Sequence, residues 1–267
     1  MRKNRMEVPV VGLIEGIRSE TEDLLVVEEP MEIFLNGSPY YLTMRMPGEE
    51  MPLALGYCFT EGTIDSIDDV ALVNYCQEEK GNRVEITLDE ARMATRGPTI
   101  KQKRLTTYSS CGICGKDMIE DIHVALKKRE KTVTIDTDSM ELLRKTVEDH
   151  QEVSRLTGAT HAAALFNRHL KLLSFSEDVG RHNALDKAIG NLVFVKKVQE
   201  AAIVFLTSRL SYEMVQKAAR LGAEILIGMS SATLLAAELA QSIDLTLVKF
   251  SGRGRFKIYS APDRIIM

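Results

Sequence analysis

The sequence predicts an α/β protein in two parts, a small N-terminal α+β unit followed by a larger α/β unit. Apolar strands alternate with short helices from residue 160 onward, whereas the first ninety residues show turn signals typical of hairpins. The 267 residues are 45% hydrophobic and 27% charged, which suits a globular protein with a sizeable core. We predict a small α+β domain over residues 1–105 and an α/β domain over residues 106–267.

The N-terminal unit is predicted to hold two hairpins and one helix. Asn36-Gly37 separates two β-rich runs, and this pair tolerates the positive φ angles of a tight turn. A second hairpin is predicted around Lys80-Gly81-Asn82, and the helix between the hairpins ends near Gly62. In chain order the elements are strands 31–35 and 39–45, a helix over 49–62, and strands 70–76 and 83–88.

The next stretch, residues 91–110, shows no clean period. It carries five basic side chains, namely Arg92, Arg96, Lys101, Lys103 and Arg104. We predict a mobile basic connector here, although a solvated linker without a function fits the pattern equally well. A helix is predicted over residues 115–130, because its apolar residues share one face and three cations fall in its last turn.

The second half of the chain predicts βαβ units and a mostly parallel sheet covered by helices. Ligands of such sheets bind outside the carboxyl ends of the strands, where polar segments 207–209, 230–231 and 251–255 are predicted to lie. The predicted elements are a hairpin of strands 161–166 and 170–175, helix 184–193, strand 201–206, helix 211–222, strand 224–229, helix 233–240, strand 245–250 and an edge strand over 255–260.

The composition argues against several classes of partner. A net charge of −4 and the absence of Trp do not favour nucleic acid or an anionic membrane as a partner. No segment approaches the ~20 consecutive apolar residues that a membrane span needs. The basic start MRKNR is not followed by a long apolar run, so we expect no export and a cytoplasmic location.

Four cysteines in a cytosolic chain of this length do not predict a disulfide framework. Cys58 and Cys76 each lie in an apolar stretch, and we predict that both are small buried hydrophobic residues. Cys111 and Cys114 instead form a motif, because two residues separate them in the segment SSCGICGK.

The paired cysteines are candidates for sulfur chemistry. A helix N-terminus and Lys116 would both lower the pKa of a thiol below ~8.5 and favour the nucleophilic thiolate. A structural zinc site would need further ligands that the sequence does not offer in a suitable pattern. The spacing of Cys111 and Cys114 leaves open a disulfide exchanger, an inert pair and a thiolate that accepts and passes on a sulfur atom.

A second candidate site is Gly180-Arg181-His182-Asn183, which precedes the apolar stripe of a helix. Free N–H groups and a guanidinium group could face an anion there. A helix cap in which Arg181 pairs with Asp178 or Asp186 explains the pattern equally well.

A third candidate is FSGRGR, residues 250–255, at the end of a buried strand. Its two glycines and two arginines suit close approach of the backbone to phosphates, although a plain Gly-rich turn remains open. His161 is a weak further candidate, because zinc deaminases have a Glu two residues after the His, and Ala163 stands there.

These segments together resemble one known family. SSCGICGK, EDVGRHNALDKAIG, SRLSYEMVQKAA and LVKFSGRGRFKIY are similar to the formate dehydrogenase accessory sulfurtransferase family (FdhD), as are TMRMPGEE and FTEGTI near the N-terminus. The resemblance therefore spans nearly the whole chain.

The resemblance implies a sulfurtransferase that takes sulfur from a cysteine desulfurase as a cysteine persulfide. The sulfur then passes to the molybdenum bis(guanine dinucleotide) cofactor that formate dehydrogenase requires, which binds as a substrate. By this similarity Cys111 carries the persulfide and Cys114 assists. The implied cofactor-binding residues are Phe250, Ser251, Gly252, Arg253, Gly254 and Arg255, with Gly180, Arg181, His182 and Asn183 as a second anion site.

The resemblance also implies a cytidine-deaminase-like α/β/α sandwich, a homodimer and no structural metal. Two other functions remain in view. The chain could bind the molybdenum cofactor as a chaperone without transferring sulfur, or it could be a metal-dependent deaminase or a dithiol oxidoreductase.

Overall fold

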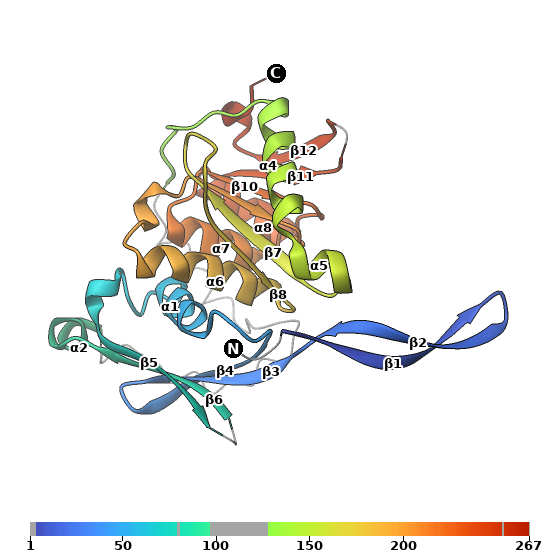
Figure 1. Cartoon of the computed structure of the whole chain (residues 1–267). Coiled ribbons are helices and arrows are strands. Elements are labelled where there is room, and N and C mark those ends of the chain that lie inside the picture. The colour runs from blue at the N-terminus through green and yellow to red at the C-terminus, as the bar shows by residue number, and fades with distance from the viewer. Residues whose placement is uncertain (1–3, 79–80, 97–127, 253, 267) are drawn as a thin grey trace.

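The fold is a mixed α/β arrangement of three sheets and the helices between and around them (Figure 1). The structure is a computed structural model that describes residues 4–78, 81–96, 128–252 and 254–266. No helix in these ranges is long and apolar enough to cross a membrane. The predicted helix over 115–130, the predicted domain boundary at 105/106 and most of the basic connector lie outside the described residues.

The N-terminal unit contains a four-stranded sheet in the order β4-β3-β6-β5. Its strands are β3 (Glu29–Leu35), β4 (Ser38–Arg45), β5 (Val70–Glu78) and β6 (Gly81–Leu88). Helix α1 (Glu50–Thr60) packs on this sheet, so both predicted hairpins and the predicted helix are confirmed. The first turn forms because Asn36 and Gly37 both adopt positive φ angles, of 50° and 75°.

Two elements of the N-terminal half differ from the sequence predictions. An antiparallel hairpin of β1 (Arg5–Ile14) and β2 (Ile17–Val26) precedes the sheet and extends away from the body of the molecule (Figure 1). In addition, the start of the predicted connector is helical, because α2 spans Glu90–Arg96. Arg92 is buried there and donates to the carbonyl oxygen of Thr63 over 2.8 Å. Arg92 therefore fastens α2 to the body instead of belonging to a mobile segment.

The C-terminal unit contains a six-stranded sheet in the order β12-β11-β10-β9-β7-β8. Only β9, β10 and β11 run parallel to their neighbours in this group, whereas β7, β8 and β12 pair antiparallel. Three of the five strand pairings described in this sheet are antiparallel, so the prediction of a mostly parallel sheet was wrong, whereas the predicted hairpin of residues 161–166 and 170–175 is confirmed by β7 and β8. The strands are β7 (His161–Phe166), β8 (Leu172–Asp178), β9 (Ile203–Leu206), β10 (Ile225–Gly228), β11 (Thr246–Phe250) and β12 (Phe256–Ser260).

Helices cover both faces of the six-stranded sheet. One face carries α6 (Arg181–Phe194), α7 (Tyr212–Leu221) and α8 (Leu234–Ser242), all three near their predicted positions. The opposite face carries α4 (Thr137–His150), which the sequence analysis missed, as it missed the short helix α5 (Glu152–Thr157). This α/β/α layering agrees with the predicted class, and its cytidine-deaminase-like description stays a prediction.

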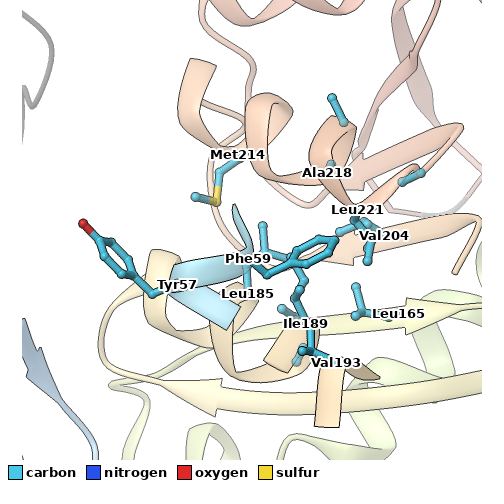
Figure 2. Packing of buried hydrophobic residues seen from close by; sticks show 14 of the residues in the cluster. Tyr57, Phe59, Leu165, Leu185, Ile189, Val193, Val204, Met214, Ala218 and Leu221 are labelled. Atoms are coloured by element: carbon cyan, nitrogen blue, oxygen red, sulfur yellow. The ribbon is translucent and has the colours of Figure 1, made fainter. Parts of the chain in front are cut away.

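One continuous apolar core joins the two sheets. Helix α1 lies against α6 and α7, and Figure 2 shows Phe59 of α1 beside Leu185 of α6 and Val204 of β9. Gly56 and Gly190 stand at the crossing of α1 and α6, and a Cβ atom on either would overlap backbone of the opposite helix. The N-terminal unit is therefore in direct backbone contact with the helix that carries one candidate site.

Candidate functional site

The predicted site segments that the structure describes gather at one edge of the six-stranded sheet. His161 begins β7 and lies opposite Asp178, the last residue of β8. Next to β7, strand β9 ends at Leu206, and the backbone N–H of Ala162 donates to Thr207 Oγ1 over 2.8 Å. The segments after β10 and β11 leave the same edge, as expected for parallel neighbours of β9.

Asp178 holds the N-terminus of α6 in place. Its Oδ1 accepts hydrogen bonds from the backbone N–H of Gly180, over 2.9 Å, and from Asn183 Nδ2, over 3.1 Å. Its Oδ2 accepts the backbone N–H of Met46 over 3.1 Å and pairs with Lys187 Nζ over 2.7 Å. Asp178 and Lys187 are fully buried, so each charge is balanced only by the protein.

Asn183 belongs to this structural network. Its Nδ2 also donates to the carbonyl oxygen of Met44 over 2.7 Å, and its Oδ1 accepts from Thr43 Oγ1 over 3.2 Å. The side chain is 5% exposed and is hydrogen-bonded at both ends. Asn183 therefore ties the end of β4 to the start of α6.

His182 and Glu213 connect the starts of α6 and α7. The imidazole Nε2 contacts the carboxylate, and both side chains remain partly exposed. The hydrogen bond from His182 holds the pKa of Glu213 below its usual value, against the opposite effect of burial.

Arg181 lies close to two further basic groups, His161 and Arg209. Its Nε is buried and has no hydrogen-bond partner among the described residues. Burial, and then the neighbouring charge of Arg209, lowers the pKa of Arg181. The alternative in which Arg181 pairs with Asp178 or Asp186 is wrong, because Asp178 pairs with Lys187 and Asp186 pairs with Lys217 over 2.8 Å.

The segment after β11 forms a tight glycine loop before β12. The N–H of Ser251 donates to the carbonyl oxygen of Arg255 over 2.8 Å, and Gly252 and Gly254 have φ angles of 79° and 68°. The N–H of Gly254 donates to Glu141 Oε1 of α4 over 3.0 Å. Only glycine adopts such angles without strain, so the loop depends on both glycines. Arg253 lies outside the described residues.

A cavity of about 550 Å³ opens beside this loop. Strand β11 supplies Lys249 to its wall, and the Lys249 ammonium donates to Ser231 Oγ over 3.0 Å. Phe250 is only 2% exposed and packs edge-to-face on Phe256, so its ring mainly supports the loop. The lining residues are Arg144, Glu148, Met229, Lys249, Phe250, Ser251 and Gly252.

Sequence reasoning missed the contribution of α4 to this cavity. Arg144 lies over the ring of Phe250, 5.7 Å from its centre, and pairs with Glu141 over 2.8 Å and with Glu148. Apolar residues at helical spacing, Met140, Leu143 and Val147, were the available signal for this helix.

The cysteines divide into two groups. Cys111 and Cys114 lie outside the described residues. Cys58 is fully buried in α1, as predicted, and burial raises the pKa of its thiol strongly. Cys76 is only partly buried on β5, so its predicted burial was wrong. Within the part of the chain that the structure describes, no group of three His, Cys, Asp or Glu side chains is arranged to hold a metal ion.

Comparisons of this chain with known proteins agree on one family. The model of the FdhD/NarQ family matches residues 26–266. A relative from Sulfolobus acidocaldarius named "Sulfur carrier protein FdhD" is 35% identical over 260 residues, which cover 97% of this chain and 98% of the relative. A protein of the same name from Sulfurisphaera tokodaii is 36% identical, with 94% and 96% of the two chains covered.

A solved structure shares the fold. It comes from Desulfotalea psychrophila and is described as that of a formate dehydrogenase accessory protein. The match has a TM-score of 0.79 and 24% identity, and it covers 99% of this chain and 100% of the solved one.

Proposed function

The chain belongs to the FdhD/NarQ family, and from this membership we propose that it is a sulfur carrier protein that serves formate dehydrogenase. The match extends over residues 26–266, so it includes the four-stranded sheet, the six-stranded sheet and all the described candidate site residues. That full-length match is the observation on which the assignment depends.

The chemistry that we propose is a sulfur relay through Cys111. The thiolate of Cys111 attacks the outer sulfur of a cysteine persulfide on the desulfurase, which forms the Cys111 persulfide and releases the desulfurase cysteine as a thiolate. Cys114 assists or resolves it: its thiolate attacks the inner sulfur of Cys111, so that the outer sulfur leaves as sulfide and a Cys111–Cys114 disulfide forms. The persulfide then gives its terminal sulfur to the molybdenum bis(guanine dinucleotide) cofactor, which is the substrate. Transfer requires the two reacting atoms to approach within about 3–3.5 Å, so the cofactor must be held in a fixed position while the sulfur arrives.

The edge of the six-stranded sheet supplies groups that suit such a substrate. A cofactor with two guanine dinucleotide arms carries two pyrophosphates, and it needs more than one anion site. The Ser251–Arg255 loop offers the exposed side chain of Arg255, and the start of α6 offers the half-buried side chain of Arg181. Both lie at the carboxyl edge of β9, β10 and β11, where open α/β sheets bind ligands.

A cofactor-binding chaperone that transfers no sulfur is the second candidate. The described groups at the sheet edge are suited to binding anions, and they alone would hold a cofactor without any thiol. A homodimer and a cytoplasmic location, which the sequence predicts, remain part of the proposal for either function.

Mass spectrometry after incubation with a cysteine desulfurase and cysteine tests the relay. We expect the mass of one added sulfur atom on the peptide that contains Cys111, and its loss in Cys111→Ala. The same variant should fail to yield active formate dehydrogenase. Cys76→Ala is the matched control, because Cys76 is partly exposed, and it should keep both sulfur uptake and activation.

Two results would contradict the relay. The first is an absence of sulfur on Cys111 in the wild-type protein. The second is full activation of formate dehydrogenase by Cys111→Ala, which would instead support the chaperone function. Cys58 is not expected to take up sulfur in the folded protein, because it is fully buried and its pKa is raised.

A further inference from the structure

Basic side chains lie close together where β7 begins and where β8 and β9 end. We propose that Arg181 and Arg209, with His161, form a site for the pyrophosphate of a nucleotide, separate from the Ser251–Arg255 loop. The inference rests on the proposed function, because it names the residues that would hold the second dinucleotide arm of the cofactor.

The backbone brings the three residues together. His161 lies opposite Asp178. The Oδ1 of Asp178 accepts a hydrogen bond from the N–H of Gly180, the residue before Arg181. On the other side of β7, the N–H of Thr207 donates to the carbonyl oxygen of Ala162 over 3.1 Å, and Arg209 follows two residues later. Thus β8 and β9 each deliver one arginine next to the first residue of the strand between them.

The charges in this cluster are not balanced by the protein. Neither Arg181 nor Arg209 forms an ion pair with any residue in the described ranges. Glu213, the acidic side chain that faces Arg181, is in contact with His182. Asp178, the acidic group near His161, is already paired with Lys187. Burial, and then the charges of Arg181 and Arg209, lowers the pKa of His161, which indicates a positive potential at this point.

The hydrogen-bond donors of this cluster indicate which class of ligand it binds. Guanidinium groups form charge-assisted, bidentate hydrogen bonds with phosphate oxygens. The N-terminus of α6 adds the favourable end of a 14-residue helix dipole for an anion. Arg209 is exposed and Arg181 is half-buried, so the site is open to a large ligand.

The site differs from the Ser251–Arg255 loop in position. Arg209 follows β9, whereas Ser251 follows β11, and β10 lies between these two strands. Two strand spacings correspond to roughly 10 Å. A single pyrophosphate cannot occupy both places, whereas two pyrophosphates of one ligand can.

The structure also separates the roles within Gly180-Arg181-His182-Asn183. Asn183 is buried and bonded at both ends of its amide, and the Nε2 of His182 is in contact with Glu213. Of these four residues, Arg181 is the one with a charged side chain that forms no ion pair within the described ranges, and its Nε has no hydrogen-bond partner there. Arg181 is therefore assigned to the ligand, and Asn183 is assigned to holding the helix start in place.

Isothermal titration of the full chain with inorganic pyrophosphate and with guanosine diphosphate tests this site. Each of Arg181→Gln and Arg209→Gln should weaken binding of both probes at this site about 10-fold or more, as expected for the loss of charge-assisted hydrogen bonds. Arg168→Gln is the matched control, because Arg168 is exposed in the turn after β7, at the opposite edge of the sheet. It should leave the affinity unchanged.

The proposal is overturned if the double variant Arg181→Gln/Arg209→Gln binds both probes as tightly as the wild-type protein. An equal loss in Arg168→Gln would also overturn it, because binding would then reflect net charge alone. If the double variant loses affinity for pyrophosphate but keeps its affinity for guanosine diphosphate, a nucleotide is excluded as the ligand.

Failure of this inference can be told apart from failure of the sulfur relay. The double variant should still take up sulfur on Cys111 from the desulfurase, since that step does not require the nucleotide. If it binds guanosine diphosphate normally while Cys111 takes up sulfur, the second phosphate site is wrong and the relay stands. If Cys111 takes up no sulfur in the wild-type protein, the relay fails whatever the titration shows.

Discussion

Asp178 has no exposed surface, and its two carboxylate oxygens contact four different groups. Lys187 neutralises it, and the N–H groups of Gly180 and Met46 and the amide of Asn183 complete its hydrogen bonds. Lys187 in turn donates to the carbonyl oxygen of Met46 over 2.9 Å. The pair therefore sets the position of the segment after β4 and of the start of α6 together.

Removal of Lys187 should show how much this network contributes to stability. Lys187→Met leaves the Asp178 carboxylate buried without its counter-charge, so we expect the free energy of unfolding to fall by about 3–5 kcal/mol. Urea denaturation followed by circular dichroism measures the change.

Lys197→Met is the control for that experiment. Lys197 is 55% exposed and lies 3.9 Å from Glu200, and exposed pairs of this kind contribute about 0–1 kcal/mol. Equal effects of the two substitutions would mean that the buried pair has no special structural role.

At the residue level, the sequence predicted which segments lie at the edge of the sheet better than it predicted the contacts of their side chains. The run Gly180–Asn183 was recognised from its position before a helix, but besides the nearby Asp178 the partners of Asn183 include Thr43 and Met44, about 140 positions earlier. Such long-range contacts leave no local pattern. The proximity of Arg209 to Arg181 likewise depends on the strand order β9-β7-β8, which no spacing in the sequence reveals.

At the level of elements, strong local signals gave correct predictions. Asn36-Gly37 produced the expected turn, and the strands and helices from β7 to β12 lie near their predicted ranges. The hairpin of β1 and β2 was not predicted. In the structure its tight turn is formed by Glu15 and Gly16, which have positive φ angles of 50° and 83°. Glu is an uncommon residue at such a position, so the signal was weaker than Asn-Gly or Asp-Gly.

The crossing of α1 and α6 gives a prediction for a whole element. A Cβ atom on Gly190 would overlap the carbonyl oxygen of Pro52, so Gly190→Ala must push the two helices apart. Overpacking of this kind costs about 1–3 kcal/mol, and we expect a lower midpoint of thermal unfolding.

Gly12→Ala provides the comparison, because its nearest neighbour would be the flexible side-chain oxygen of Ser19 at 3.1 Å. Its effect should be about 0.5 kcal/mol or less. If Gly190→Ala is as mild as Gly12→Ala, the helices are not in the close contact described above.

At the scale of the whole molecule, the two parts that the sequence separates share one core. Met31 and Ile33 of β3, Leu55 of α1 and Leu185 of α6 all belong to the same buried apolar cluster. The sequence indicates a change of pattern between the halves, but periodicity carries no information on how two units pack against each other. The antiparallel pairing of β7 with β9 in the larger sheet was missed for the same reason.

Because the core is shared, we expect the described body to unfold in a single cooperative transition. Calorimetry should show one peak whose van't Hoff and calorimetric enthalpies agree. A fragment of residues 128–267 should not fold alone, since the faces of α6 and α7 that pack on α1 would be exposed. Two separate peaks, or a stable fragment, would show that the halves are independent.

The hairpin of β1 and β2 stands outside that cooperative unit (Figure 1). Leu13, Ile14 and Ile17 near its tip are 73%, 71% and 72% exposed, and a lone two-stranded ribbon is at best marginally stable in water. Its tip therefore opens and closes on its own, at little cost in free energy, while the body stays intact. A protease added to the native protein would cut first near this tip, and the trimmed chain would retain the six-stranded sheet and the candidate site residues at its edge.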